Sequence, residues 1–214
     1  MIILMIDCET TSLSPKRGVA HQLGFYAVRP ATGEVLLAEQ FDLPTRASQW
    51  DKATLDWATH QPALANSLPS GLSPAEVEEQ RARIEASALK AVNWLEDYAD
   101  RAGCPVAVVV QHPEFDLPFY EDCGVDLRRL FGHRNIFDLN SLLVGFYAGR
   151  FPNTDTKKIM VGNQTKIKGD HTALGDCKAQ MLRLQTANWG GLTAYYPAYT
   201  RPAPTLVSGA GLEN

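Results

Sequence analysis

The sequence lacks several features that would assign it to a familiar class of protein. Its 214 residues contain no apolar run near the length of a membrane span, and the opening segment 1–6 is far too short for one. No basic leader precedes that segment, so we do not interpret it as a signal peptide. The four cysteines show no CxxC pairing, which argues against a zinc site or a disulfide framework. We therefore expect reduced thiols and a cytoplasmic protein with no membrane partner.

The chain also lacks an excess of positive charge. Lys and Arg number 20 against 24 Asp and Glu, which gives a formal net charge of −4. This balance argues against a general electrostatic attraction to nucleic acid. It does not exclude a nucleic-acid enzyme, because clustered active-site carboxylates would themselves contribute to the negative charge. An apolar fraction of 45% and a charged fraction of 21% are ordinary for a globular protein.

Five segments are predicted to be β-strands. Residues 2–6 and 106–110 are continuous apolar runs, which are typical of strands buried on both faces. A turn-forming Pro-Ala-Thr-Gly segment at 30–33 separates two further patterned segments, which predicts an antiparallel hairpin. The predicted strands are residues 2–6, 23–28, 34–43, 106–110 and 135–137.

Helical spacing of apolar residues is clearest in one long segment. Ser73 is a cap candidate, Pro74 is typical of a first helical turn, and Gly103 is expected to end the helix. Strands combined with helices are typical of a mixed α/β domain, which we place at residues 1–189. Residues 190–214, rich in Pro, Gly and Tyr, are expected to form a C-terminal extended tail. Further helices are predicted at 52–59, 112–119, 138–148 and 172–188, and a polar loop at 149–169.

Two carboxylates follow the first predicted strand. Asp7 and Glu9 are two residues apart, so in extended backbone their side chains leave the same face. Sheets of α/β proteins place functional groups at such strand ends. Carboxylates aimed together repel each other unless a cation or a proton lies between them. A solvated strand end explains a bare Asp-x-Glu pair equally well.

Three more polar residues follow later predicted elements. Asp116 comes after a buried strand and would by itself be an ordinary helix cap. His171 and Asp176 would lie roughly 140° apart on a single helix. They converge only if His171 stands just before the helix, with Asp170 or Thr172 as its cap. Taken alone, each of these features is better explained by a structural or surface role.

In combination and in this order, the three motifs resemble those of the DnaQ-like DEDDh 3′–5′ exonucleases. This is the family of polymerase proofreading subunits, ribonuclease T and oligoribonuclease. The first motif covers residues 7–13, with Ser12 where glycine is usual. The second covers 111–116, with Gln111 in place of the usual asparagine, and the third covers 171–176 without departure. The resemblance covers most of the chain, and both departures fall outside the residues that match the family's metal ligands.

A further segment, residues 54–61, resembles a tryptophan-and-glutamine segment of the phage DexA-like and exonuclease VIII branch of this family. A short amphipathic helix with a buried Trp57 explains the same residues equally well. The sequence leaves these two interpretations open.

The resemblance implies a ribonuclease-H-like fold, a mixed α/β sheet flanked by helices. It also implies two Mg²⁺ ions, which Mn²⁺ can replace, and hydrolysis that releases a nucleoside 5′-monophosphate from the 3′ end of a single strand. Carboxylate oxygens are the hard ligands that these ions prefer. His171 would accept the proton of the attacking water, because neutral imidazole is available near physiological pH. The implied metal ligands are Asp7, Glu9, Asp116 and Asp176, and with His171 they form the implied catalytic set.

Other residues are candidates for contact with the substrate. The resemblance implies that Leu13 wedges against the terminal base, although simple packing explains Leu13 equally well. The backbone at Thr10 and Thr11 would meet the 3′-hydroxyl. Lysines in the polar segment before His171 could neutralise phosphates upstream of the scissile bond, but a solvated loop explains them too. These lysines are Lys157, Lys158, Lys166 and Lys168.

The sequence leaves the substrate and the assembly open. DNA is favoured by the resemblance to the DexA-like branch alone, and a 3′–5′ exoribonuclease of the same family is the alternative. A phosphomonoesterase, a structure-specific nuclease or a catalytically silent nucleic-acid-binding module could use the same fold. The complete catalytic set argues against the silent module. A homodimer is a further expectation, since many members of the family form one.

Overall fold

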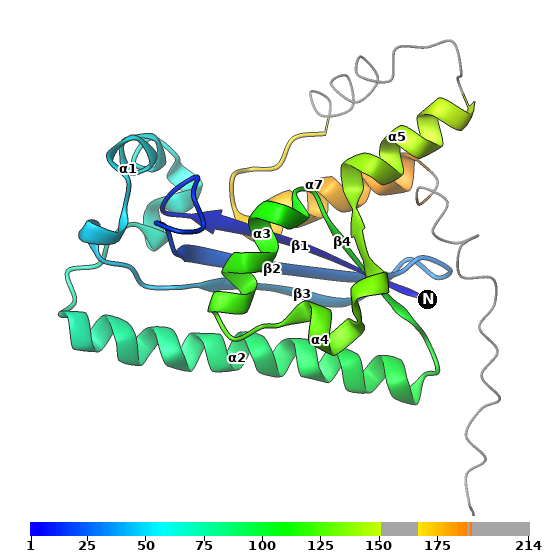
Figure 1. The fold of residues 1–214 in the computed structure, drawn as a ribbon, viewed down its shortest axis with the longest axis horizontal. Coiled ribbons are helices and arrows are strands. Elements are labelled where there is room, and N and C mark those ends of the chain that lie inside the picture. Colours follow the sequence, from blue (N-terminus) through cyan, green and yellow to red (C-terminus); the bar gives the residue numbers. More distant parts are fainter. Residues whose placement is uncertain (151–166, 188, 190–214) are drawn as a thin grey trace, which may run out of the picture.

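The computed structural model describes residues 1–150, 167–187 and 189, and the structural statements below refer to these residues. A five-stranded mixed sheet forms the centre, with the strand order β3-β2-β1-β4-β5 (Figure 1). β1 pairs antiparallel with β2 and parallel with β4, and these two neighbours pair with β3 and β5 in turn. The strands are β1 (Ile2–Thr10), β2 (Ala20–Arg29), β3 (Glu34–Asp42), β4 (Val106–Val110) and β5 (Ile136–Asp138).

Helices cover both faces of this sheet (Figure 1). One apolar cluster joins the sheet to α2, α3 and α4, and a second joins the other face to α5 and α7. No helix in the described part of the chain is long and apolar enough to cross a membrane. The helices are α1 (Lys52–Ala58), α2 (Pro74–Arg101), α3 (Pro113–Asp122), α4 (Leu127–Phe131), α5 (Leu139–Arg150) and α7 (Ala173–Thr186), with 3-10 turns at Ala47–Gln49, Pro62–Ser67 and His133–Asn135.

β1 is the central strand, and its side chains alternate between the two apolar clusters. Ile2, Leu4 and Ile6 are fully buried on the face covered by α2, α3 and α4. Ile3 and Met5 are fully buried on the face covered by α5 and α7. The alternation follows from the period of two along a strand. Burial on both faces explains why this segment is a continuous apolar run.

The predicted mixed α/β sheet with flanking helices is confirmed, and α2 begins where its sequence signals predict. The Ser73 hydroxyl accepts a hydrogen bond from the Glu76 N–H, and the Glu76 carboxylate accepts one from the Ser73 N–H. A cap of this kind contributes roughly 1 kcal/mol to stability. The helix ends at Arg101, and Gly103 follows it with a φ of 61°.

β1 is longer than the apolar pattern predicts. The apolar run ends at Ile6, but the strand continues to Thr10. Residues 7–9 keep the antiparallel pairing with residues 22–24 of β2, whereas the parallel partner β4 ends opposite Ile6 at Val110. The two carboxylates of this segment therefore stand on a regular strand, beyond the end of its parallel neighbour.

Other local features also differ from expectation. The sequence does not predict α4, a short helix that Asp126 caps by accepting a hydrogen bond from the Arg129 N–H. Trp57 lies in the predicted helix α1 but is 42% exposed, so the interpretation of a buried Trp57 is wrong. α5 extends into the start of the predicted polar loop. Most of that loop, and the predicted tail at 190–214, lie outside the described residues.

Candidate active site

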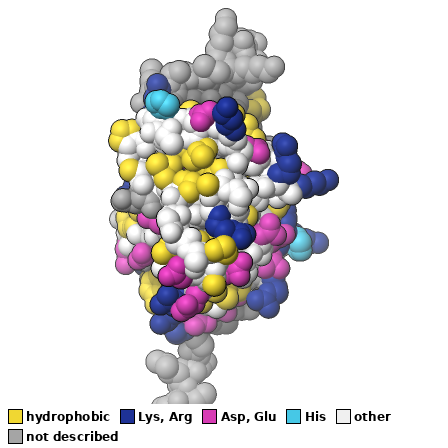
Figure 2. All heavy atoms as spheres, turned by 90° about the vertical axis from the view of Figure 1, so that its left-hand side faces the viewer, with side chains coloured by type: hydrophobic (Ala, Val, Ile, Leu, Met, Phe, Trp, Pro, Cys, Tyr) yellow, Lys and Arg dark blue, Asp and Glu magenta, His cyan; other side chains and the backbone are white. Residues whose placement is uncertain are grey.

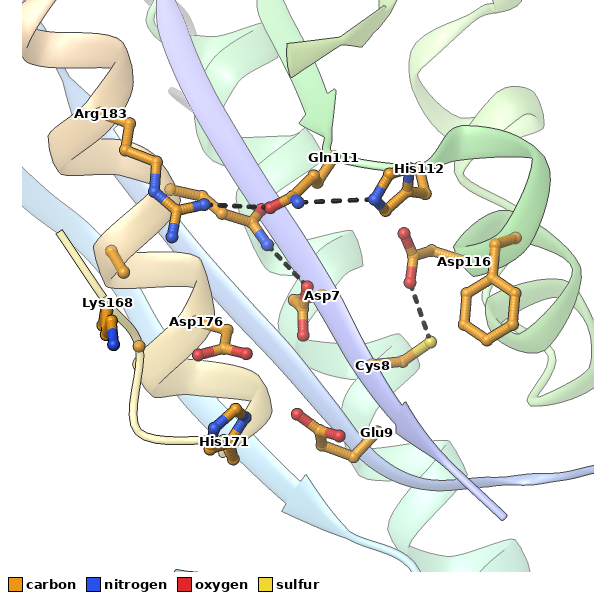
Figure 3. A pocket seen from close by; sticks show the side chains of 14 residues that line it. Asp7, Cys8, Glu9, Gln111, His112, Asp116, Lys168, His171, Asp176 and Arg183 are labelled. Carbon is orange, nitrogen blue, oxygen red and sulfur yellow. Dashed lines mark hydrogen bonds between the residues drawn. The ribbon is translucent and has the colours of Figure 1, made fainter. Parts of the chain in front are cut away.

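Asp7 and Glu9 project from β1 on the face that α7 covers. They continue the alternation of Ile3 and Met5, so one face of the strand changes from apolar to acidic along its length. Their shared face, predicted from the spacing, is confirmed (Figure 3). Because both stand on a regular strand rather than on a loop, the backbone pairing fixes their separation.

The start of α7 brings Asp176 to these carboxylates. The Thr172 hydroxyl caps the helix by accepting a hydrogen bond from the Gly175 N–H at 3.0 Å. The Asp170 carboxylate in turn accepts hydrogen bonds from the N–H and the hydroxyl of Thr172, at 3.1 and 2.6 Å. His171 stands just before the helix with a φ of 61°. This is the arrangement that the spacing of His171 and Asp176 requires if their side chains are to converge.

A glycine of β2 allows α7 to approach the sheet closely. A Cβ at Gly24 would lie 2.4 Å from the carbonyl carbon of Ala173, so no other residue fits without a shift of the helix. The side-chain oxygen of Gln22 accepts a hydrogen bond from the Ala173 N–H at 3.1 Å. Gly24 is also the β2 partner of Asp7. The first turn of α7 is therefore held beside the strand position that carries Asp7.

Three carboxylates meet in one cavity of about 520 Å³. Asp7, Glu9 and Asp176 each offer one oxygen atom, and these atoms all lie within 4.8 Å of one another. At this spacing a single metal ion could contact all three. Figure 3 shows the three side chains turned toward one another, with His171 beside Glu9 and Asp176.

Asp116 lines the same cavity from the first turn of α3. It is buried, and its Oδ1 accepts a hydrogen bond from the Cys8 thiol at 3.3 Å. Its backbone N–H donates to the carbonyl of His112 at 2.9 Å, which fixes the start of the helix. Asp116 lies outside the close group of three (Figure 3). The cavity is nevertheless lined by every member of the predicted catalytic set: Asp7, Glu9, Asp116, His171 and Asp176.

Burial raises the pKa of each carboxyl group in this cavity. Burial, with repulsion from Asp176 and Asp116, raises the pKa of Glu9 to about 8. Burial raises the pKa of Asp116 to about 6, although the hydrogen bond from Cys8 opposes this effect. Burial also raises the pKa of Asp176, and burial followed by carboxylate repulsion raises that of Asp7. Four acids so placed cannot all be charged at neutral pH unless a cation lies among them.

Gln180 of α7 is a site residue that the sequence analysis does not identify. It is buried, and its Nε2 donates a hydrogen bond to Oδ1 of Asp7 at 2.6 Å. Its Oε1 is buried and has no hydrogen-bond partner among the described residues. Gln180 follows Asp176 by four residues and so lies on the same helix face, but this spacing does not indicate that its amide reaches Asp7 on β1.

Arg183, one turn further along α7, forms hydrogen bonds with two other segments of the cavity wall. Its Nε and Nη2 donate to the carbonyl of Ile167 at 3.0 and 2.7 Å. Its Nη1 donates to Oε1 of Gln111 at 3.2 Å. Gln111, a position at which the second motif departs from the family that it resembles, thus makes a direct contact with α7. The sequence analysis does not identify this contact either.

The predicted substrate contacts lie only partly at the cavity. Lys168 lines it. Leu13 is 85% exposed and lines a neighbouring hollow together with Phe115, so simple packing does not explain it. The side chains of Thr10 and Thr11 make hydrogen bonds within the connection between β1 and β2 and do not line the cavity. The other predicted lysines, Lys157, Lys158 and Lys166, lie outside the described residues.

The surface on the α1 side of the molecule has no dominant charge. In Figure 2, basic and acidic side chains are interspersed around a group of apolar ones, and no basic patch dominates this face. This agrees with the net charge of −4.

No family model and no curated protein matches the sequence. Solved structures do match the fold. Exonuclease I of E. coli, in complex with a dT13 oligonucleotide, aligns with a TM-score of 0.58 and 16% identity over 91% of this chain and 43% of that one. Exonuclease I of Methylocaldum szegediense aligns with a TM-score of 0.56 and 14% identity, over 91% and 43%. Cell-death related nuclease 4 aligns with a TM-score of 0.51 and 15% identity, over 90% and 64%.

The chain has the fold of these nucleases. The predicted ribonuclease-H-like α/β class is therefore confirmed. At such low identity the likeness shows the fold and not the activity. The chain also spans less than half the length of the exonuclease I proteins that it matches. The resemblance of residues 54–61 to the DexA-like branch stays a prediction.

Proposed function

We propose that this chain is a metal-dependent 3′–5′ exonuclease that removes nucleoside 5′-monophosphates from single-stranded DNA. The observation that carries the proposal is the close group of Asp7, Glu9 and Asp176, which shares one cavity with Asp116 and His171. The fold adds support, because exonuclease I with this fold was solved with a bound dT13 strand. A phosphomonoesterase would not need the neighbouring hollow that Leu13 and Phe115 line.

The acidic residues fit a hard divalent cation. Every donor in the close group is a carboxylate oxygen, which is the ligand type that Mg²⁺ and Mn²⁺ prefer. The raised pKa values of Glu9 and Asp116 indicate that the acidic residues of the cavity lack a neutralising charge of their own. Asp7, Glu9 and Asp176 would hold one ion, and Asp7 with Asp116 would hold a second. When bound, such ions polarise the scissile phosphate and stabilise negative charge on the attacking and leaving oxygens.

The residues of the chain would then orient the substrate and move one proton. A water oxygen would attack the phosphorus of the terminal phosphodiester, and the bond from phosphorus to the 3′ oxygen of the upstream nucleotide would break. That oxygen would take a proton from solvent. An imidazole nitrogen of His171 accepts the proton of the attacking water. Gln180 holds Asp7 through one carboxylate oxygen and so limits rotation of that side chain. The products are a nucleoside 5′-monophosphate and a strand that is one nucleotide shorter.

Two features near the cavity would bind other parts of the strand, namely a base and the backbone phosphates. The hollow lined by Leu13 and Phe115 is apolar and open, which suits an unstacked base. Lys168, and in this proposal Lys166 two residues before it, would neutralise backbone phosphates. The backbone at Thr10 would lie nearest to the 3′-hydroxyl. Both N–H and C=O of Thr11 already have protein partners, which leaves Thr11 a smaller part in this contact.

The experiment that tests the proposal uses 5′-labelled strands of DNA and RNA, single and double, with and without Mg²⁺. We expect a ladder of single-stranded DNA shortened one nucleotide at a time from the 3′ end, which EDTA abolishes and Mg²⁺ or Mn²⁺ restores. Asp176→Asn should abolish turnover, whereas the control Glu78→Gln, at an exposed position of α2, should not change it. Preferential shortening of RNA would establish the exoribonuclease alternative. Binding of the strands without any cleavage would establish the silent module.

A further inference from the structure

Trp57 is an exposed aromatic residue that contacts the proposed general base. Its indole meets the imidazole of His171 edge to face, with ring centroids 5.4 Å apart and an angle of 88° between the planes. Trp57 comes from α1, far from His171 in the sequence, and is 42% exposed although it takes part in this contact. A tryptophan that only stabilised α1 would be expected to bury its ring against the small apolar cluster beneath that helix.

α1 is anchored to the segment that follows the acidic end of β1. The N–H of Asp51, the residue that precedes α1, donates to the carbonyl of Thr11 at 3.0 Å. The Ser12 hydroxyl donates to the Asp51 carboxylate. On its inner side the helix buries Ala58 against Trp50. Because these contacts fix α1 relative to β1, the indole of a residue on α1 has a defined position relative to the carboxylates on β1.

His171 has little else to define the direction of its ring. The residue is exposed and stands at a φ of 61°, outside the helix that follows it. Within the described part of the chain, its imidazole has no hydrogen-bond partner, and Trp57 is the aromatic ring against it. Edge-to-face contact has a preferred geometry, so an indole on one side of the imidazole favours particular ring orientations.

We propose that Trp57 is a positioning residue for His171, which keeps the imidazole turned toward the cavity shared with Glu9 and Asp176. This inference rests on the proposed function, because it gives His171 the role of general base. An aromatic pair of this kind favours the oriented state by roughly 2- to 10-fold. Trp57 would therefore change the rate of the chemical step and leave the binding of the strand unchanged.

The test compares Trp57→Leu and Trp57→Phe with Trp94→Leu, in otherwise wild-type protein and in the His171→Ala background. Trp94 is a matched control, since it is 44% exposed and stacks on Tyr98 in α2. Trp57→Leu should lower kcat on single-stranded DNA by roughly 2- to 10-fold with KM unchanged. Trp57→Phe should retain most of the rate, and Trp94→Leu all of it. In the His171→Ala background, Trp57→Leu should have no further effect.

A second readout does not depend on activity. The NMR resonance of the His171 Cε1–H in the free protein should shift in Trp57→Leu and stay in place in Trp94→Leu. No shift would overturn the contact. A rise in KM, or a loss of rate that persists in the His171→Ala background, would overturn the positioning role in favour of direct contact between Trp57 and the substrate. Full activity in His171→Ala alone would instead overturn the role of His171 in the proposed function, whatever the NMR measurement gives.

Discussion

Removing the charge of Glu9 should stabilise the metal-free protein at alkaline pH. The pKa of this carboxyl group is raised from its ordinary value of 4.5 to about 8 by burial and by its acidic neighbours. A group whose pKa is higher in the folded state stabilises the fold below its unfolded pKa, and loses that contribution as the pH rises through the folded pKa. Ionisation of Glu9 should therefore destabilise the folded wild-type protein progressively between about pH 4.5 and pH 8.

The size of this effect follows from the same two pKa values. Their difference corresponds to at most about 5 kcal/mol above pH 8, a large share of the roughly 5–15 kcal/mol that stabilises a typical domain. Asp7 and Asp176 titrate in the same space, so the protons are shared and 5 kcal/mol is an upper bound. Even a third of this free energy would raise the melting temperature of Glu9→Gln over that of the wild type by about 3–6 °C.

Thermal melts in EDTA between pH 5 and pH 9 measure this difference. Glu9→Gln should melt close to the wild type at pH 5 and above it at pH 8.5, whereas Glu78→Gln should follow the wild type throughout. Buried His21, whose pKa is lowered to about 4, destabilises all three proteins alike as the pH falls below its ordinary value of 6.5. Saturating Mg²⁺ should raise the melting temperature of the wild type more than that of Glu9→Gln. Parallel melting curves for Glu9→Gln and the wild type would refute the reasoning.

Three further outcomes are expected from the same site. His171→Ala should lower the rate by roughly 10²- to 10⁴-fold in single-turnover assays. Retention of the wild-type rate would show that His171 is not the general base. Gln180→Leu removes the hydrogen bond to a β1 carboxylate and should weaken Mg²⁺ activation by roughly 10- to 100-fold, while exposed Gln185→Leu on the same helix should not. Lys168→Gln should flatten the log–log salt dependence of strand binding, measured in Ca²⁺, by about 0.7 if it neutralises one phosphate. An unchanged slope, equal to that of the exposed control Lys178→Gln, would remove Lys168 from the phosphate contacts.

The catalytic set is predicted from the family resemblance, whereas two features of its local geometry follow from the backbone period alone. Asp7 and Glu9 share a face because a strand repeats every two residues, and this holds wherever the strand lies in the fold. The position of His171 before α7 follows in the same way, since only a break in the helix there lets it reach Asp176. Both predictions rest on a few consecutive residues, and both are confirmed.

The end of β1 is predicted wrongly because an apolar run reports burial and not pairing. Residues 7–9 are polar or only partly apolar, yet their backbone continues the hydrogen-bonded ladder with β2. Gln180 and Trp57 are missed as site residues for a related reason. Each contacts a residue far away in the sequence, so neither its helix period nor its neighbours indicate the contact. Such residues become visible only when the tertiary structure brings the segments together.

Apolar packing around the site holds its acidic side chains close together. Burial raises the pKa of both Asp7 on β1 and Asp176 on α7, and repulsion from the neighbouring carboxylates adds to the effect on Asp7. The same strand buries Ile3 and Met5 on the same face, and the same helix buries Met181 against them. Full burial of each such side chain contributes about 1.5–3 kcal/mol, so the three together are at least comparable with the cost of one buried acid. The close approach at Gly24 thus holds the start of α7, and with it Asp176, beside the strand that carries Asp7 and Glu9.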